Sequence, residues 1–297
     1  MIQESSRNKW IGLVGRSLIG FAQTKSAGGP TMSLSLVRTE RIGPVAWLCL
    51  SQPDQRNPLS LEMIQALTEG LESAYSDNGV RVIVITAEGP VFSAGHDLKE
   101  MMQGDTESAE DYRERIELIL DRCAALMTGI VTAPKPVIAS VQGTATAAGC
   151  QLVSACDLAL AASDARFCTP GVNIGTFCTT PLVGIGRNLS RKHAMEMALT
   201  GDMFSAKDAR KFGLINRHVA PEDLRSETQA LAEKIASRSP QSIRDGKAAF
   251  YAQVEMPLEQ AFAHANRVMR DALIATEDGV EGRRAFIEKR PPRWSDS

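Results

Sequence analysis

Residues 137–158 read Val-Ile-Ala-Ser-Val-Gln-Gly-Thr-Ala-Thr-Ala-Ala-Gly-Cys-Gln-Leu-Val-Ser-Ala-Cys-Asp-Leu. The largely apolar run 137–141 predicts a buried strand, residues 143–149 are small enough for a tight turn, and residues 151–156 have helical character. A helix that starts at such a turn leaves backbone N–H groups unpaired, and these can hold an oxygen that becomes negative during a reaction. An ordinary turn packed with small residues is the simpler interpretation.

A second stretch repeats this order. Residues 82–85 read Val-Ile-Val-Ile and predict a strand, and residues 89–98 follow as Gly-Pro-Val-Phe-Ser-Ala-Gly-His-Asp-Leu. Asp97 is placed to cap a helix that we expect to begin near Leu98. Because two turns of this kind can each supply one N–H to the same oxygen, the pair favours an oxyanion site over two ordinary turns.

The two stretches resemble the two signatures of the enoyl-CoA hydratase/isomerase, or crotonase, family. The first signature is similar to residues 92–98, and the second is similar to residues 143–152 with the Cys-Asp-Leu at 156–158. Further similarities lie at 56–60, 199–206 and 281–290, so the resemblance extends over residues 33–297. It implies an α/β crotonase fold, with a spiral of ββα units over residues 33–218 and a helical trimerisation region over residues 219–297.

The resemblance also implies a site. In this family the two turns bind the carbonyl oxygen of an acyl-coenzyme A (acyl-CoA) thioester and stabilise the enolate that forms from it. The matching donors here are the backbone N–H groups of His96 and Ala148, and removal of one such donor costs on the order of 100-fold or more in rate. The residues expected to contact coenzyme A are Arg56, Ala94, Asp97, Leu98, Lys99, Phe286 and Lys289, and those expected to line the pocket are Gly95, Gly149, Gly171, Thr176 and Cys178.

Three of these residues have simpler interpretations. Arg56 is a surface cation unless it touches a phosphate of the ligand. Phe286 and Lys289 match family positions that contact coenzyme A held by a neighbouring subunit, and without that match they would be a core residue and a solvent-exposed one.

The acid/base positions depart from the family pattern. Family hydratases use two glutamates to position and activate water, and the matching positions here hold Gln151 and Gly171. A glutamine can hydrogen-bond a water but cannot take a proton near neutral pH, and a glycine has no side chain to offer. The His96 imidazole is the obvious replacement base, although this residue can equally serve through its amide alone. The weaker candidates nearby are Cys168 and Cys178, which we expect to be pocket walls, and Asp157, which we expect to be structural.

We therefore expect a lyase of the enoyl-CoA hydratase family that binds an acyl-CoA in fatty acyl-CoA metabolism, without the two-glutamate mechanism of hydration. Two alternatives remain open. One is a decarboxylase of the same fold, because decarboxylation needs an enolate stabiliser but no base to start it, and residues 94–97 also resemble the family's decarboxylases. The other is an acyl-CoA-binding protein with no chemistry of its own. We expect no cofactor beyond the coenzyme A of the substrate, and a homotrimer or a dimer of trimers.

Composition and charge argue against several other classes. The 297 residues are 43% hydrophobic and carry a formal charge of −2, so we expect a globular protein without a nucleic-acid-binding surface. The six cysteines form no Cys-x-x-Cys pair and the four histidines are scattered, which favours a reducing compartment and no structural metal site. No apolar run approaches the roughly 20 residues that a membrane span needs.

Residues 1–32 stand apart from the rest of the chain. Apolar residues alternate there with basic ones, as in a transit peptide, but Glu4 and the shortness of the pattern favour a disordered extension. We accordingly expect a cytoplasmic protein, with the mitochondrial matrix as the alternative if this segment is a transit peptide. Either Met1 or Met32 can begin the functional protein.

The remaining segments alternate between strands and helices, as an α/β layer requires. Ser60 is expected to cap a helix whose apolar residues extend from 61 to 75, and Ser190 and Ser205 are expected to cap two shorter helices, the second ending at Gly213. A strand is expected at 45–50, and helices are expected at 116–130, 224–235, 243–251 and 258–273. The hydroxyl-rich loop 167–181 is expected to line the pocket.

Overall fold

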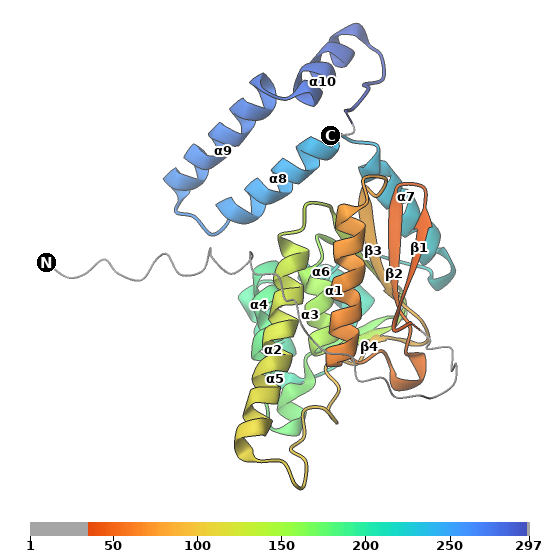
Figure 1. Cartoon of the computed structure of the whole chain (residues 1–297), viewed down its shortest axis with the longest axis vertical. Coiled ribbons are helices and arrows are strands. Elements are labelled where there is room, and N and C mark those ends of the chain that lie inside the picture. Colours follow the sequence, from red (N-terminus) through yellow and green to blue (C-terminus); the bar gives the residue numbers. More distant parts are fainter. Residues whose placement is uncertain (1–34, 296–297) are drawn as a thin grey trace, which may run out of the picture. The chain divides into compact units, whose positions relative to one another are not determined.

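Two sheets form the centre of the computed structural model, which describes residues 35–295 (Figure 1). Within these residues, the larger sheet has six strands in the order β1 (Val37–Ile42), β2 (Val45–Leu50), β3 (Val82–Ala87), β5 (Val137–Val141), β7 (Leu158–Ala162) and β10 (Arg217–Val219). β1 is antiparallel to β2, and the other neighbours are parallel. The smaller sheet has the order β4 (Val91–Ser93), β6 (Thr144–Thr146), β8 (Arg166–Cys168) and β9 (Phe204–Ser205).

From β3 to β8, the two strands of each consecutive pair lie in different sheets. β3 and β4, β5 and β6, and β7 and β8 each place the first strand in the larger sheet and the second in the smaller one. A helix follows each pair, and these helices are α2 (Ala109–Val131), α3 (Ala148–Ala155) and α4 (Thr179–Asn188). The first unit keeps β1 and β2 in one sheet and continues into α1 (Leu61–Ser76). This repeat of two strands and a helix confirms the predicted ββα spiral.

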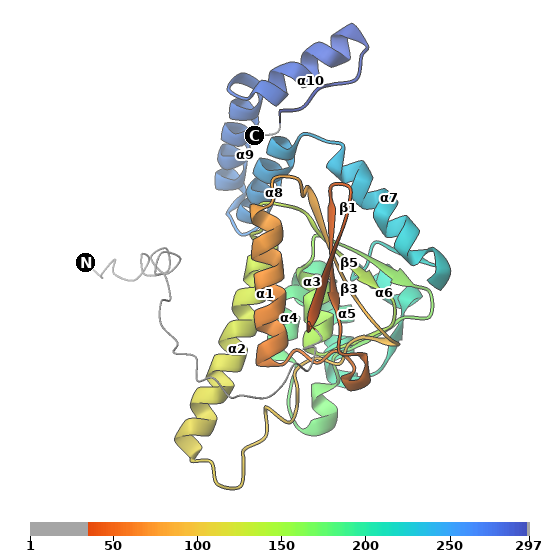
Figure 2. The ribbon, with the colours of Figure 1, turned by 45° about the vertical axis from the view of Figure 1, so that its right-hand side comes forward.

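Helices cover both faces of the larger sheet. Figure 2 shows α1 on one side of this sheet and α7 (Leu224–Ala236) on the other. All five residues of β5 are buried, as are Val82 to Ile85 of β3. Strands that are buried on both faces read as continuous apolar runs, which is why the predictions at 45–50, 82–85 and 137–141 are confirmed.

Hydroxyl caps begin several helices where the sequence predicts them. The Ser60 Oγ accepts a hydrogen bond from the Met63 N–H at 3.1 Å, at the start of α1. Ser205 and Asp208 form a reciprocal capping box at the start of α6 (Ala206–Phe212), and Gly213 ends that helix with a left-handed φ of 97°. The predicted cap at Ser190 is also present, at the start of α5 (Arg191–Thr200).

Two local predictions are wrong. The helix expected to begin near Leu98 is a single turn, in which the Met101 N–H reaches the carbonyl oxygens of Asp97 and Leu98, both at 3.2 Å. The segment expected to be only a turn contains the short strand β6, because its backbone pairs with β4 and β8 in the smaller sheet. That pairing is a tertiary contact, and small residues give little sign of it in a sequence.

The C-terminal part of the described chain is helical. α7 is joined to the larger sheet by the Trp47 Nε1–H, which donates to the Gln229 Oε1 at 2.8 Å, and by the Ser140 and Thr228 hydroxyls, 3.2 Å apart. The predicted helices are confirmed as α7, α8 (Pro240–Gln253) and α9 (Leu258–Ile274), and α10 (Glu277–Glu288) packs mainly on α8 and α9. The division at residue 219 stays a prediction, and the extension predicted at 1–32 lies outside the described residues.

Candidate active site

The first of the two turns follows β4 and is held by the segment before α1. Gly95 has a φ of 86°, and a Cβ added there would lie 3.0 Å from both the Ala147 Cβ and the Thr146 carbonyl oxygen. The Gly95 carbonyl accepts a hydrogen bond from the Leu59 N–H at 2.7 Å, and the Ala94 N–H donates to the Arg56 carbonyl at 3.0 Å. Glycine is required at 95 because the left-handed backbone and the close approach both exclude a side chain.

The second turn follows β6 and starts α3 abruptly. Ala147, the residue before the helix, has a φ of 48° and a ψ of −118°, a conformation that costs a non-glycine residue on the order of 1–3 kcal/mol. Its N–H donates to the Cys168 carbonyl at 3.0 Å, and its carbonyl accepts from the Gln151 N–H at 3.0 Å. The Thr146 Oγ1 donates to the Ala94 carbonyl at 2.8 Å, so this hydrogen bond ties the two turns together.

The two predicted donors lie close to each other and have no partner. A Cβ added to Gly95 would be 3.1 Å from the Ala148 nitrogen, and Gly95 is the residue directly before His96. Within residues 35–295, neither the His96 N–H nor the Ala148 N–H donates to any acceptor of the chain. Ala148 is the first residue of α3, where a helix leaves its N–H groups unsatisfied and positive. The two N–H groups therefore lack an acceptor among the described residues and belong to adjacent segments, and their binding of one oxygen stays a prediction.

The His96 side chain is held in one tautomer. Its Nδ1 lies 3.2 Å from the Leu59 carbonyl oxygen, which can only accept, so Nδ1 carries the proton. Its Nε2 is buried and has no hydrogen-bond partner within the described residues. Burial lowers the pKa of His96 below its ordinary value, although the Leu59 carbonyl and Glu100 act in the opposite direction. The imidazole is therefore neutral at pH 7, with the Nε2 lone pair available to accept a proton.

The Gln151 side chain lies between α3 and α2. It is buried, and its Oε1 is 4.0 Å from the Cys123 Sγ on α2. An amide in this place can orient a polar group, but it has no acidic or basic function near neutral pH.

A loop near β8 surrounds the other position that departs from the hydratase pattern. The Gly171 N–H donates to the Cys178 Sγ at 3.3 Å, and the Gly171 carbonyl accepts from the Thr176 Oγ1 at 3.2 Å. A Cβ added to Gly171 would lie 3.0 Å from both the nitrogen and the Sγ of Cys178. The thiol of Cys178 therefore occupies the space that a longer side chain at 171 would need.

The thiols beside this loop are poor nucleophiles. Burial raises the pKa of Cys178, and burial together with Cys178 raises the pKa of Cys168 to about 11. Both side chains are therefore protonated at neutral pH. Thr169 belongs to the loop 167–181 that we expect to line the pocket, and it is fully buried beside Cys168 with no partner for its Oγ1 among the described residues.

Asp157 has the structural role that we expected. Its carboxylate accepts hydrogen bonds from the Val137 N–H at 2.8 Å, the Lys247 Nζ at 2.7 Å and the Tyr251 hydroxyl at 3.0 Å. These contacts join the start of β5 to α8 and leave no role for Asp157 at the two turns.

The residues expected to contact coenzyme A fall into two groups. Arg56 is exposed, and its carbonyl is hydrogen-bonded to Ala94, so it lies beside the first turn. Leu98 and Lys99 are also exposed next to this turn, and the Asp97 Oδ1 accepts from the Lys99 N–H at 2.9 Å. Phe286 (86% exposed) and Lys289 lie on α10 and at its end. The structure thus brings the first group to the turns, and the contacts of all these residues with a ligand stay predictions.

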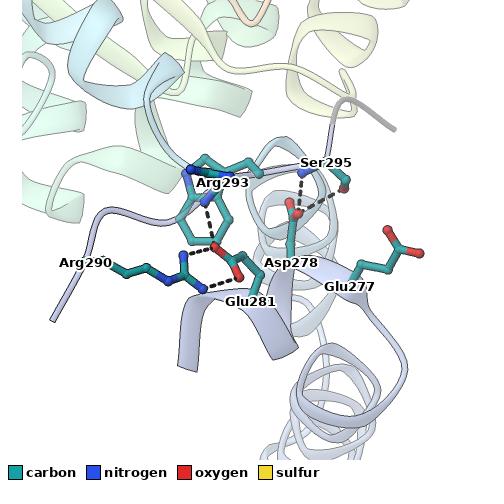
Figure 3. Close-up of a pocket in the computed structure, with 7 residues that line it drawn as sticks. Glu277, Asp278, Glu281, Arg290, Arg293 and Ser295 are labelled. Carbon is teal, nitrogen blue, oxygen red and sulfur yellow. Dashed lines mark hydrogen bonds and ion pairs between the residues drawn. The ribbon is translucent and has the colours of Figure 1, made fainter. Parts of the chain in front are cut away.

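In a pocket at the end of the described chain, the lining residues pair with one another (Figure 3). It has a volume of 530 Å³, and Arg290 donates to both carboxylate oxygens of Glu281 at 2.6 and 2.9 Å. Ser295 donates to Asp278 through its N–H and its hydroxyl. Hydrogen bonds from Arg290 hold the pKa of the Glu281 carboxyl at about 2. The polar groups of this pocket therefore serve to fasten residues 290–295 to α10.

Residues 35–295 give no evidence of a metal site, a membrane span or a disulfide. This part of the chain contains no group of three or more His, Cys, Asp or Glu side chains that could hold a metal ion. None of the helices described is long and apolar enough to cross a membrane. The six cysteines all lie in this range and all are free.

A spiral of ββα units with this topology defines the crotonase fold, and comparison with known proteins supports this class. The human enoyl-CoA hydratase domain-containing protein 3 is similar in structure, with a TM-score of 0.82, 42% identity and coverage of 87% of this chain and 100% of that one. An enoyl-CoA hydratase from Mycobacterium smegmatis has a TM-score of 0.81 and 44% identity, with coverage of 87% and 98%.

Sequence comparison then gives the family. The enoyl-CoA hydratase/isomerase family model matches residues 40–297, and the chain belongs to this family. A mitochondrial enoyl-CoA hydratase domain-containing protein 3 from Xenopus laevis is 47% identical over 250 residues, which cover 84% of this chain and 83% of the relative. The resemblance drawn from the two signatures is confirmed.

Proposed function

We propose that this protein binds an acyl-CoA thioester and stabilises its enolate, with the thioester oxygen on the His96 and Ala148 amides. The observation that supports this proposal most strongly is the pair of adjacent N–H groups without acceptors in the described chain. The charge on the thioester oxygen grows as the enolate forms, so donors fixed beforehand stabilise the transition state more than the ground state. The positive end of α3 acts in the same direction.

The His96 imidazole is the base in this proposal. Its Nδ1–H is held by the Leu59 carbonyl, and its neutral Nε2 can take a proton from the substrate or from water. Gln151 can orient a water or a substrate group through its amide. Hydration by two glutamates is not part of the proposal, because Gln151 and Gly171 stand at those positions.

Decarboxylation is the second candidate. It breaks a carbon–carbon bond to release carbon dioxide and leaves the same enolate, so no base is needed to start it. The observation that favours it is the uncharged amide of Gln151, since a glutamate at that position would repel the carboxylate of a malonyl-type thioester.

A screen of acyl-CoA thioesters for both binding and conversion tests these functions. Crotonyl-CoA turnover above background supports the lyase function, and carbon dioxide release from malonyl-type thioesters supports decarboxylation. If thioesters bind but none is converted, the protein is a binding protein without chemistry. If no thioester or free coenzyme A binds, the proposal is wrong.

Assembly into homotrimers, or dimers of trimers, is also part of the proposal. α8, α9 and α10 leave large apolar side chains exposed, and these include Phe250, Leu258, Phe262, Met269, Phe286 and Ile287. Several large apolar side chains exposed on neighbouring helices are typical of an interface. A neighbouring subunit would then place its Phe286 and Lys289 at the bound coenzyme A.

We propose the mitochondrial matrix as the location. The expectation of a cytoplasmic protein finds no support among the relatives, because the Xenopus protein is named as mitochondrial. Fractionation of cells that express the whole chain with a C-terminal tag tests this: recovery in the matrix supports the proposal, and recovery in the cytosol overturns it.

A further inference from the structure

Basic side chains line a cavity at the amino-terminal ends of two strands of the larger sheet. It has a volume of 180 Å³ and lies where β3 and β5 begin, next to Arg81 and Lys135. Arg238 and Arg244 line it from the segment before α8 and from α8 itself. The oxyanion turns come after the opposite ends of these parallel strands, so the cavity is separate from the proposed active site.

The residues that line this cavity include four cations and no carboxylate. Nearby carboxylates offset part of this charge. Asp77 acts on Lys135, although it also accepts from Arg41 at 3.1 Å and from the Gly79 N–H at 2.8 Å. Asp278 accepts from the Ser239 hydroxyl at 2.5 Å, and it also interacts electrostatically with Arg81. Asp245 is 3.3 Å from Arg244 in an exposed pair, which is worth little in water. The lining is therefore positive.

Lys135 has one donor left for a ligand. Its Nζ donates to the carbonyl oxygens of Ala74 at 2.8 Å and Asp77 at 2.7 Å, and an ammonium group carries three donors. Burial lowers the pKa of Lys135, the Asp77 carboxylate acts in the opposite direction, and repulsion from Arg81 adds to the lowering. An anion in the cavity would reduce this repulsion between like charges.

We propose that the cavity binds a small phosphate-type anion through the Arg238 and Arg244 guanidinium groups and the Lys135 ammonium group. A volume of 180 Å³ corresponds to about six waters at roughly 30 Å³ each, which is room for a tetrahedral oxyanion with some of its hydration. Arginine matches phosphate because its planar fork can donate two parallel hydrogen bonds. The bound anion would join the end of α1 and the starts of β3 and β5 to α8, and so would stiffen the point where the C-terminal helices leave the sheet.

Titration calorimetry of the full chain with inorganic phosphate and with pyrophosphate tests this site, against chloride at the same ionic strength. The variants are Arg238→Gln/Arg244→Gln and, as the control, Arg113→Gln, which removes an exposed arginine from α2 far from the cavity lining. The thermal midpoint of each variant without phosphate checks that it is folded.

We expect saturable binding of phosphate or pyrophosphate to the wild-type chain and to Arg113→Gln, and affinity at least about 10-fold lower in the double variant. Absence of saturable binding to the wild-type chain would overturn the proposal. Equal affinity in the wild-type chain and the double variant would do the same. No acyl-CoA is used, so the outcome is independent of the proposed function.

Discussion

Gly95 and Ala147 show how single residues create the candidate site. Both have positive φ, and both are held there by hydrogen bonds from outside their own turns, to Leu59 and Cys168. The Ala147 conformation is strained, whereas glycine adopts positive φ without this cost, and the next two N–H groups, of His96 and Ala148, donate to no acceptor in the described chain. Strain of this kind persists only where the surrounding structure fixes it, and it is common at functional sites.

Gly95→Ala is expected to destabilise the protein by about 1–3 kcal/mol and to abolish thioester binding, because a Cβ would crowd Ala147 and the backbone at 146 and 148. Gly129→Ala is the matched control, since that glycine lies in α2 with no atom within 4 Å of an added Cβ. The control should raise the free energy of unfolding by about 0.5–1 kcal/mol. Chemical denaturation measures both, and equal stability of the two variants would contradict the account.

His96→Ala is expected to lower turnover by about 100-fold or more while thioester affinity changes little, because the amide at 96 remains. Steady-state kinetics measures the turnover, and a direct binding assay measures the thioester affinity. Unchanged turnover would mean that His96 serves through its amide alone.

The pH dependence follows from the lowered pKa of His96. Its pKa is lower in the folded protein than the unfolded value of about 6.5, so the unfolded state binds more protons below that pH. Stability should therefore fall as the pH drops from 6.5 toward the folded pKa, and His96→Ala should remove part of this decrease. Thermal midpoints between pH 4.5 and 7.5 would test it, in buffers at about equal ionic strength. Identical pH profiles for both proteins would contradict this assignment.

The sequence predicted the two turns because small residues, strand patterns and helix caps are local features. It did not predict the Leu59 carbonyl that fixes His96, the Cys178 sulfur beside Gly171 or the buried hydroxyl of Thr169. Each of these depends on a contact between segments that the chain brings together only on folding.

At the scale of elements, α8 is anchored at the end of the larger sheet by Asp157 and by the Lys247 Nζ, which also donates to the Ile130 and Lys135 carbonyl oxygens at 3.0 and 3.2 Å. Asp157 binds the β5 N–H of Val137 together with Lys247 and Tyr251 of α8. The Lys247 and Asp157 side chains are 7% and 16% exposed, so solvent screens this pair only weakly. α9 and α10 follow α8 in the chain, and their attachment relies on it.

Lys247→Met is expected to lower the free energy of unfolding by about 3 kcal/mol, because it leaves the Asp157 carboxylate largely buried with one partner fewer. Arg187→Met is the control, since the Arg187–Glu255 pair is 61% exposed on both sides and should contribute less than about 1 kcal/mol. Urea denaturation compares the two. Similar small losses for both variants would contradict the anchoring role of Asp157.

Elements were predicted well where the hydrophobic pattern is strong. The strands at 45–50 and 82–85 are apolar throughout, the strand at 137–141 is apolar except for Ser140, and the helices carry apolar faces with hydroxyl caps. β6 was missed because Thr-Ala-Thr pairs only through contacts with β4 and β8. The prediction of a helix near Leu98 was wrong because the aspartate cap supports a turn, but Leu98 and Met102 behind it are 56% and 70% exposed and do not pack on the core.

At the scale of the whole molecule, the proposed trimer rests on the exposed apolar side chains of α8, α9 and α10. Phe262 and Met269 on α9 are 63% and 62% exposed, and they lie two turns apart on the same side of the helix. A trimer would bury this stripe and complete each site with residues from its neighbour.

Phe262→Glu/Met269→Glu is expected to convert trimers or hexamers into monomers with weaker coenzyme A binding, because two charges would have to be buried in the interface. Leu199→Glu is the control, on α5 with 60% exposure and outside the proposed interface. Light scattering after size exclusion measures the mass of each. A wild-type chain that is monomeric at all concentrations would contradict the assembly.

The most direct test of the central claim is a crystal structure of the protein with a non-reactive acyl-CoA thioester analogue. The account predicts that the carbonyl oxygen of the analogue lies about 2.7–3.1 Å from both the His96 and the Ala148 nitrogens. An analogue bound with this oxygen away from both amides, or amides occupied by acceptors of the chain itself, would contradict it.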